Sequence, residues 1–192
     1  REEGRIHRYL HLSTGNYNDK TARQYTDIGM FVSNPDICAD VAALFNVMTG
    51  YAEPPHWRVL AVAPFNLRER FLELIDREAR LSRPHRPGHI VAKLNSLVDP
   101  EIIEHLYKAA RQGVKVDLVV RGICYLNPDI ETDNIRVVSV VDRYLEHSRI
   151  FRFDNGGSPD YYLGSADWMP RNLDRRIEVV WPVYDSGARG LL

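Results

Sequence analysis

The stretch "LEHSRIFRFDNGGSPDYYLGSAD", residues 145–167, decides how this chain folds. Residues 148–153 are typical of one strand and residues 161–165 of another, and the "DNGG" between them is a strong hairpin signal. In an antiparallel pair, the start of the first strand lies beside the end of the second. The hairpin is therefore predicted to place His147 next to the loop Gly164-Ser165-Ala166-Asp167 at one edge of a sheet.

The side chains at that edge suit phosphoryl chemistry. His147 supplies an imidazole, which attacks phosphorus or moves a proton near neutral pH. Arg149 supplies a guanidinium that spreads positive charge over phosphate oxygens, and the small loop residues allow close approach to the backbone. A histidine at the start of a strand is more often a surface or structural residue, so the prediction rests on the whole group.

Three helices are predicted upstream of the hairpin from their terminal residues. Asn34 caps the first helix, which ends at Gly50, and Asn66 opens the second in a variant of the capping box. Asp99 caps the third helix, before Pro100. β-type runs at residues 59–62, 90–93 and 116–120 alternate with these helices. The alternation predicts an α/β fold with a largely parallel sheet flanked by helices.

Arg121 is the main candidate among the loops that follow these strands. Ligands of such sheets bind at the loops after the strands, and Arg121 follows the apolar run "VDLVV" directly. An arginine in this position can instead bond a backbone carbonyl, and we give that alternative equal weight.

The start of the chain repeats its end at a spacing of 151 residues. Residues 12–16, "LSTGN", fall on residues 163–167, "LGSAD", while Tyr25 falls on Arg176. Both copies have a strand, a small-residue loop, an aromatic residue, a basic residue and a second strand, which indicates two related half-domains facing one site. With Pro54-Pro55 as a boundary, residues 1–53 are predicted to end a first, truncated half-domain and residues 54–192 to form the second.

The repeat also predicts a strand upstream of Arg1. In the second copy, a hairpin strand that carries a histidine precedes the small-residue loop. In the first copy, "REEGR", residues 1–5, is typical of the turn of that hairpin. The equivalent of His147 is therefore expected before the first residue, in a longer protein.

Composition limits the function classes. The 192 residues are 44% apolar and 27% charged with a net charge of −1, so no global basic field indicates nucleic acid, and an anion site must be local. No apolar run approaches the roughly 20 residues of a membrane span. The two cysteines fit no zinc or redox spacing.

The hairpin resembles the repeated motif of the phospholipase D superfamily. That motif is His-x-Lys, four residues and Asp, followed by a Gly-Ser-x-Asn loop. The chain has His147-Ser148-Arg149, four residues and Asp154, then "GSAD", so that arginine replaces lysine and Asp167 replaces asparagine. The longer stretches "HLSTGNYNDKTARQYTDIGMF", "AKLNSLVDPEIIEHLY", "GVKVDLVVRGICYL" and "GSADWMPRNLDRRIEV" resemble the carboxy-terminal catalytic region of the bacterial polyphosphate kinase family, over essentially the whole chain.

The resemblance implies reversible transfer of the terminal phosphate of ATP to polyphosphate through a phosphohistidine that lies upstream of Arg1. It implies nucleotide contacts at Tyr25, Arg121 and His147 and a phosphate contact at Arg176. His11 matches a second family histidine, and a purely structural role for it has equal weight. Arg121, Arg149 and Arg176 are predicted to clamp phosphates. His147 is predicted to face the upstream histidine, where it would contact the nucleotide, protonate the departing phosphate or hold it by a hydrogen bond.

The resemblance also implies partners and a location. Magnesium is expected with ATP, with its ligands upstream and none in this chain. ATP, ADP and polyphosphate are the expected partners, in a cytoplasmic homo-oligomer, soluble or peripheral at the inner membrane face, without nucleic acid. The chain alone is predicted to be inactive. The alternatives are a phosphodiesterase or nuclease of the phospholipase D type and a non-catalytic module that binds polyanions.

Overall fold

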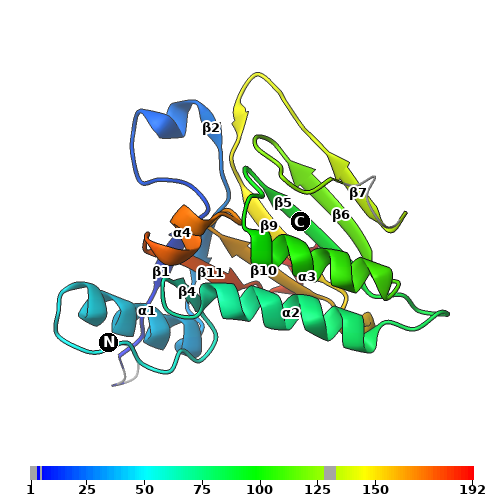
Figure 1. The fold of residues 1–192 in the computed structure, drawn as a ribbon. Coiled ribbons are helices and arrows are strands. Elements are labelled where there is room, and N and C mark those ends of the chain that lie inside the picture. Colours follow the sequence, from blue (N-terminus) through cyan, green and yellow to red (C-terminus); the bar gives the residue numbers. More distant parts are fainter. Residues whose placement is uncertain (1–3, 5, 128–132) are drawn as a thin grey trace.

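A seven-stranded mixed sheet forms the centre of the computed structural model, which describes residues 4, 6–127 and 133–192 (Figure 1). The predicted turn at residues 1–5 lies largely outside the described residues. The strands, in spatial order, are β4 (Ala61–Ala63), β11 (Glu178–Pro182), β10 (Asp160–Gly164), β9 (Arg149–Phe153), β5 (His89–Leu94), β6 (Lys115–Val120) and β7 (Ile135–Val138). The sheet and its flanking helices confirm the α/β class.

The strand directions of this sheet are mixed. Five of its seven strands point the same way, because only β9 and β11 run opposite to the others. Only the neighbours β5–β6 and β6–β7 are parallel pairs, however, while the other pairs are antiparallel. The predicted β-α-β order therefore holds for one side of the sheet, and the hairpin and the chain end build the other side.

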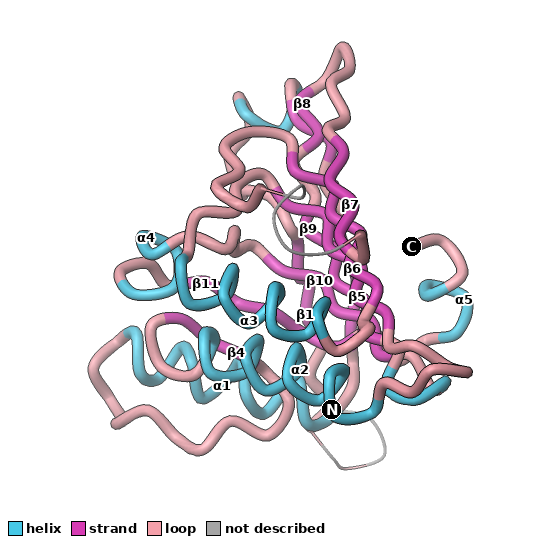
Figure 2. Tube along the Cα trace, turned by 45° about the vertical axis from the view of Figure 1, so that its right-hand side comes forward, coloured by secondary structure: helices cyan, strands magenta, loops and turns pink. Residues whose placement is uncertain are grey.

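Two long helices cover one face of the sheet. Helices α2 (Leu67–Leu81) and α3 (Pro100–Arg111) lie side by side along the strands (Figure 2). Beneath them, the ring of Phe71 lies 4.7 Å from that of Phe151 and 5.3 Å from that of Trp168, all three fully buried. This aromatic cluster holds the start of α2 against the β9–β10 hairpin.

The helix caps agree with the sequence at two of three positions. Asn34 accepts hydrogen bonds from the first backbone amides of α1 (Pro35–Met48), and Asp99 accepts one from Ile102 N at 3.1 Å. The capping box predicted at Asn66 is wrong. Its Oδ1 accepts a hydrogen bond from Val62 N at 2.7 Å instead. The side chain therefore closes the turn after β4 and does not cap the amino-terminal end of α2.

The other face of the sheet is covered by the beginning of the chain. Strands β1 (Leu10–Ser13) and β3 (Gly29–Val32) form a separate antiparallel pair. Together with α1 they enclose a second buried cluster, which takes residues from both ends of the sequence. Its buried members are Val32, Ile37, Val41, Leu44, Trp57, Leu60, Val62, Leu163, Trp181 and Val183.

The internal repeat is present in the backbone. The first copy, residues 12–32, and the second copy, residues 163–183, pair in the same register, with Ser13 opposite Gly29 and Gly164 opposite Val180. Thr14 N donates to Ile28 O at 3.0 Å, and Ser165 N donates to Val179 O at the same distance. Each bond is the other shifted by 151 residues, so the weak sequence similarity reflects a real structural repeat.

Short elements complete the fold and join its parts. Strand β2 (Tyr25–Thr26) pairs in parallel with β8 (Leu145–Glu146), which ties the first copy to the chain just before the hairpin. The remaining short helices are η1 (Thr21–Arg23), η2 (Asn155–Gly157), α4 (Pro170–Asp174) and α5 (Ser186–Arg189). Within the described residues, no helix is long and apolar enough to cross a membrane.

Candidate active site

The hairpin brings Arg149 and Asp167 together as the sequence predicts. Arg149 at the start of β9 lies opposite Gly164 at the end of β10. Its Nε donates to Asp167 Oδ1 at 3.1 Å and its Nη2 to Asp167 Oδ2 at 2.9 Å, a bidentate pair in which both side chains are buried. Such a pair fixes both groups in the plane of the guanidinium.

The third nitrogen of Arg149 connects the two copies of the repeat. Its Nη1 donates to Thr14 O at 3.2 Å and to His147 O at 2.9 Å, and it lies 2.9 Å from His147 Nε2. A guanidinium only donates hydrogen bonds, so His147 Nε2 is an acceptor here. The ring of His147 is therefore neutral, with its proton on Nδ1.

Asp27 of the first copy completes the environment of His147. The Nδ1 of His147 donates to Asp27 Oδ1 at 2.9 Å, and Thr14 Oγ1 donates to the same oxygen at 2.9 Å. Burial lowers the pKa of His147 below its ordinary value, and Arg149 lowers it further, against the opposing effect of Asp27. The imidazole is thus held in one tautomer between an anion and a cation.

Tyr25 lies beside this histidine. Its ring centroid is 4.8 Å from that of His147, at an angle of 42°. A hollow of about 330 Å³ adjoins it, lined by Arg23, Gln24, Tyr25, Arg143, Tyr144 and Leu145. The structure thus brings together Tyr25 and His147, two of the residues predicted from the sequence to contact the nucleotide.

Arg121 is linked to His147 by the side chain of Asn95, a residue that was not a site candidate from the sequence. Its Nε donates to Asn95 Oδ1 at 2.8 Å, and Asn95 Nδ2 donates to His147 O at 3.4 Å. A second hollow, of about 250 Å³, lies between Arg121 and residues 140–146. The loops after β5 and β6 therefore meet the hairpin at one edge of the sheet.

Lys93 is a further basic group that sequence reasoning missed. Its Nζ donates to Ser148 Oγ at 2.7 Å and lies 3.4 Å from Glu146 Oε2. Burial lowers the pKa of Lys93, with Arg149 acting in the same direction and Glu146 against it. Lys93 precedes the last residue of β5 and points away from the helix-covered face. Only the alternation of buried and less buried residues along β5 could have indicated this orientation from the sequence.

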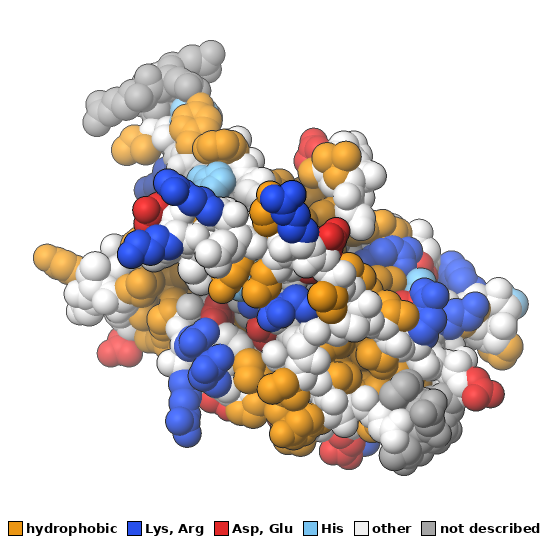
Figure 3. Space-filling view, turned by 90° about the horizontal axis from the view of Figure 1, so that it is seen from above, with side chains coloured by type: hydrophobic (Ala, Val, Ile, Leu, Met, Phe, Trp, Pro, Cys, Tyr) orange, Lys and Arg blue, Asp and Glu red, His pale blue; other side chains and the backbone are white. Residues whose placement is uncertain are grey.

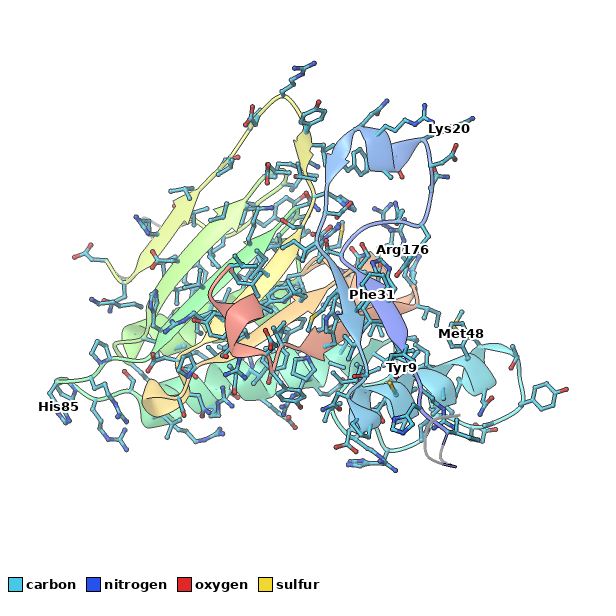
Figure 4. The ribbon with its side chains drawn as sticks, turned by 180° about the vertical axis from the view of Figure 1, so that it is seen from behind. Tyr9, Lys20, Phe31, Met48, His85 and Arg176 are labelled. Atoms are coloured by element: carbon cyan, nitrogen blue, oxygen red, sulfur yellow. The ribbon has the colours of Figure 1, made fainter. Side chains whose placement is uncertain are left out.

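Arg176 lies at the surface beside Glu178. Its side chain is 53% exposed, with Nη1 4.0 Å from Glu178 Oε1, and it sits at the surface far from the tip marked by His85 (Figure 4). Glu178 accepts hydrogen bonds from Ser165 Oγ and from Asn172 Nδ2, and burial raises its pKa. In the repeat, Glu178 stands where the first copy has Asp27.

His11 is not brought to His147. Its Nδ1 lies 2.9 Å from Tyr17 Oη, whose proton goes to His11 O at 2.8 Å, and its ring packs 4.9 Å from that of Phe31. Phe31 is 85% exposed and lies on the outer side of the β1–β3 pair (Figure 4). His11 therefore faces outward from the first copy.

The edge that carries the cluster is basic and hollowed. Seen from above, lysine and arginine side chains surround a recess with acidic groups between them (Figure 3). Among the residues that the structure describes, no group of three or more His, Cys, Asp or Glu side chains is placed to hold a metal ion. The acidic groups of the site instead pair with His147 and Arg149.

Two family models match the chain. "Polyphosphate kinase C-terminal domain 2" matches residues 60–191, and "Polyphosphate kinase C-terminal domain 1" matches residues 1–54. Similar curated proteins include a polyphosphate kinase of Bacillus anthracis, 51% identical over 96% of this chain and 27% of its own length. One of Synechocystis sp. is 54% identical over 95% of this chain and 26% of its own length. The chain thus spans about a quarter of the curated relatives it matches.

Solved structures give the same result. The crystal structure of polyphosphate kinase from Porphyromonas gingivalis matches with a TM-score of 0.89 and 45% identity, over 96% of this chain and 28% of that one. NucT from Helicobacter pylori matches with a TM-score of 0.50 and 18% identity, over 67% of this chain and 86% of that one. The second likeness concerns the fold alone.

Proposed function

Because this chain belongs to the polyphosphate kinase family, we propose that it forms part of the catalytic region of a phosphotransferase that moves the terminal phosphate of ATP to polyphosphate and back. One observation carries the proposal. A neutral His147, held by Asp27 and Arg149, lies beside Tyr25 and within one side chain of Arg121.

The arrangement suits phosphoryl transfer, which depends on positioning and on neutralising charge over the phosphate oxygens. Tyr25 and Arg121 each border one of the two hollows and are the proposed nucleotide contacts. His147 Nε2 accepts from Arg149 Nη1 in this structure, so the proposed role of His147 is to take up a proton when that contact opens. The protonated ring can then donate a hydrogen bond to an oxygen of the transferred phosphate. The nucleophilic histidine of the phosphohistidine step is proposed to lie outside residues 1–192.

We propose that Arg149 orients His147 and does not clamp phosphate, although the sequence analysis predicts a phosphate contact for it. Its guanidinium already bonds Asp167, Thr14 and His147 inside the protein. Breaking a buried bidentate pair would leave the Asp167 carboxylate unpaired, which is costly. Arg149 is therefore the proposed orienting group of His147, while Arg121 and the exposed Arg176 supply the phosphate contacts.

The repeat assigns a role to Glu178. Asp27 in the first copy holds the histidine of the second copy. By the same geometry, we propose that Glu178 in the second copy holds the histidine of the first copy's equivalent of β9, which is expected outside residues 1–192. The repeat does not tell whether His11 has a catalytic or a structural role. Its contacts with Tyr17 and Phe31 support a structural role.

Magnesium is part of the proposal only as a companion of ATP. When bound, it would neutralise charge on the nucleotide phosphates. The described residues do not fit a magnesium site, since the carboxylates at the site are already paired with basic or hydroxyl groups. The cytoplasmic location and the homo-oligomer rest on the family resemblance.

Labelled ATP tests the function in the full-length parent protein. A polyphosphate kinase is expected to form labelled polymer and an acid-labile, base-stable phosphohistidine. The variant His147→Ala should abolish polymer formation, whereas His85→Ala, at an exposed loop far from the site, should not change it. Cleavage of phosphodiesters without labelling by ATP would instead support the phosphodiesterase or nuclease alternative.

A further inference from the structure

Asn95 makes hydrogen bonds with three groups of the candidate site and has no role in the proposed function so far. It follows β5 directly and is only 4% exposed. Its Oδ1 accepts from Arg121 Nε at 2.8 Å, its Nδ2 donates to His147 O at 3.4 Å, and its backbone N donates to Asp167 Oδ1 at 2.7 Å. The residue thus links the loops after two strands to the hairpin that carries His147.

The bond to Arg121 determines which side of its guanidinium faces outward. A guanidinium is a planar fork, and an acceptor on Nε leaves the edge formed by the two terminal nitrogens for another ligand. Arg121 also lines the hollow of about 250 Å³. Because Nε of Arg121 is taken by Asn95, a bidentate contact with phosphate oxygens would use the edge of the two terminal nitrogens.

The backbone fixes Asn95 and Arg121 relative to one another. Arg121 N donates to Leu94 O at 3.2 Å, and Gly122 N donates to Asn95 O at 2.8 Å. A Cβ atom at Gly122 would lie 2.9 Å from Asn95 O, so the close approach of the two loops requires glycine there. The side chain of Asn95 therefore has a defined position from which to hold the guanidinium.

We propose that Asn95 is a positioning residue that aims the outer edge of Arg121 at the phosphates of the nucleotide and fixes it relative to His147. The inference rests on the proposed function, because it assumes that Arg121 contacts ATP. It adds a residue that acts through Arg121 and touches neither substrate nor reacting atoms. Its contribution should therefore appear in nucleotide binding and should depend on Arg121.

A double-mutant cycle in the full-length parent tests this dependence. Asn95→Ala should raise KM for ATP about 10-fold, as expected for a lost hydrogen bond to a charged group, with a smaller effect on kcat. The double variant with Arg121→Ala should be no worse than Arg121→Ala alone, since the interaction is then already absent. Multiplicative effects of the two substitutions, or an unchanged KM in Asn95→Ala, would overturn the proposal.

Two further variants separate positioning from folding. Asn66→Ala removes an asparagine that also bonds only within the protein, and should lower Tm while leaving KM for ATP unchanged. If Asn95→Ala does not fold, Asn95→Asp keeps the acceptor for Arg121 but loses the donor to His147 O, and should raise KM for ATP less than Arg121→Ala does. A folded Asn95→Asp with a KM raised as far as in Arg121→Ala would contradict the inference. A wild-type parent that forms no polymer from ATP would refute the proposed function instead.

Discussion

The tautomer of His147 depends on one carboxylate, and Asp27→Asn tests it. The asparagine lacks the charge that favours a proton on Nδ1, and its amide can turn a donor toward the ring, which favours the other tautomer. In the full-length parent we expect the rate of polymer formation to fall by up to about 10⁴, the loss seen when a catalytic histidine loses its orienting carboxylate.

A second His–Asp pair in the chain provides the control. His105 Nδ1 lies 2.7 Å from Asp76 Oδ1 between α3 and α2, on the helix-covered side of the molecule. The variant Asp76→Asn removes the same kind of contact and should leave the rate within about twofold of the wild type. Equal losses in Asp27→Asn and Asp76→Asn would mean that neither effect comes from the orientation of His147.

The lowered pKa of His147 predicts how the stability of this chain changes with pH. Below its ordinary pKa of 6.5, the unfolded chain binds a proton at this ring that the folded protein does not bind. The free energy of unfolding therefore rises with pH from the lowered folded-state pKa up to about 6.5, and this contribution is constant above that pH.

Urea denaturation between pH 5 and pH 8 measures this dependence. The variant His147→Gln should lose part of the slope below pH 6.5, because glutamine does not titrate. His85→Gln serves as the control for the substitution itself, because His85 lies on an exposed loop far from the site. A slope in His147→Gln identical to that of the wild type would show that the ring is equally protonated in both states.

Single residues of the site were predictable where the signal was local. His147 lies two residues before Arg149, the first residue of β9, and the turn "DNGG" fixes the edge at which both lie. Asp27 lies 120 residues from His147, and Asn95 lies 52 residues from it. Their roles arise only when separate elements meet, which the pattern of one chain segment does not encode.

The helices and strands were also predictable from the sequence where their stabilising contacts are local, and less so where those contacts join distant residues. The capping side chains of Asn34 and Asp99 bond amides within three residues, so their positions could be read directly from the sequence. The antiparallel pairing of β4 with β11 joins residues more than a hundred positions apart. The sequence therefore predicted the helices and the hairpin better than the strand order of the sheet.

The clearest energetic contact between elements is the carboxylate of Asp40 on α1. It accepts hydrogen bonds from the backbone amides of Arg58, Val59 and Leu60, and only 3% of the residue is exposed. Asp40→Ala would leave these amides without their acceptor. We expect the free energy of unfolding to fall by about 3 kcal/mol, as measured by urea denaturation.

Asp36 on the same helix is the matched control. Its ion pair with Arg58 spans 2.9 Å, but both side chains are more than half exposed to solvent. Asp36→Ala should therefore cost no more than about 1 kcal/mol. If both variants lost the same stability, the buried bonds to the three amides would not be what attaches α1 to the following segment.

At the scale of the whole molecule, the two copies of the repeat share one buried cluster. Val32, Ile37, Val41 and Leu44 come from the first 50 residues, and Leu163, Trp181 and Val183 come from the end of the chain. The connection between them, residues 51–56, is exposed. The association of the two parts therefore depends on packing and on contacts such as Arg149 with Thr14, rather than on chain continuity.

A cut in the exposed connection tests this dependence. With a protease site inserted between Ala52 and Glu53, the cleaved chain should elute as one species in native buffer and as two in concentrated urea. Val41→Asp places an unpaired charge in the shared cluster and should release the smaller piece without urea. Separation of the unsubstituted pieces in native buffer would mean that each part is held by its own core, and that the site at His147 needs an intact chain to keep Asp27 in place.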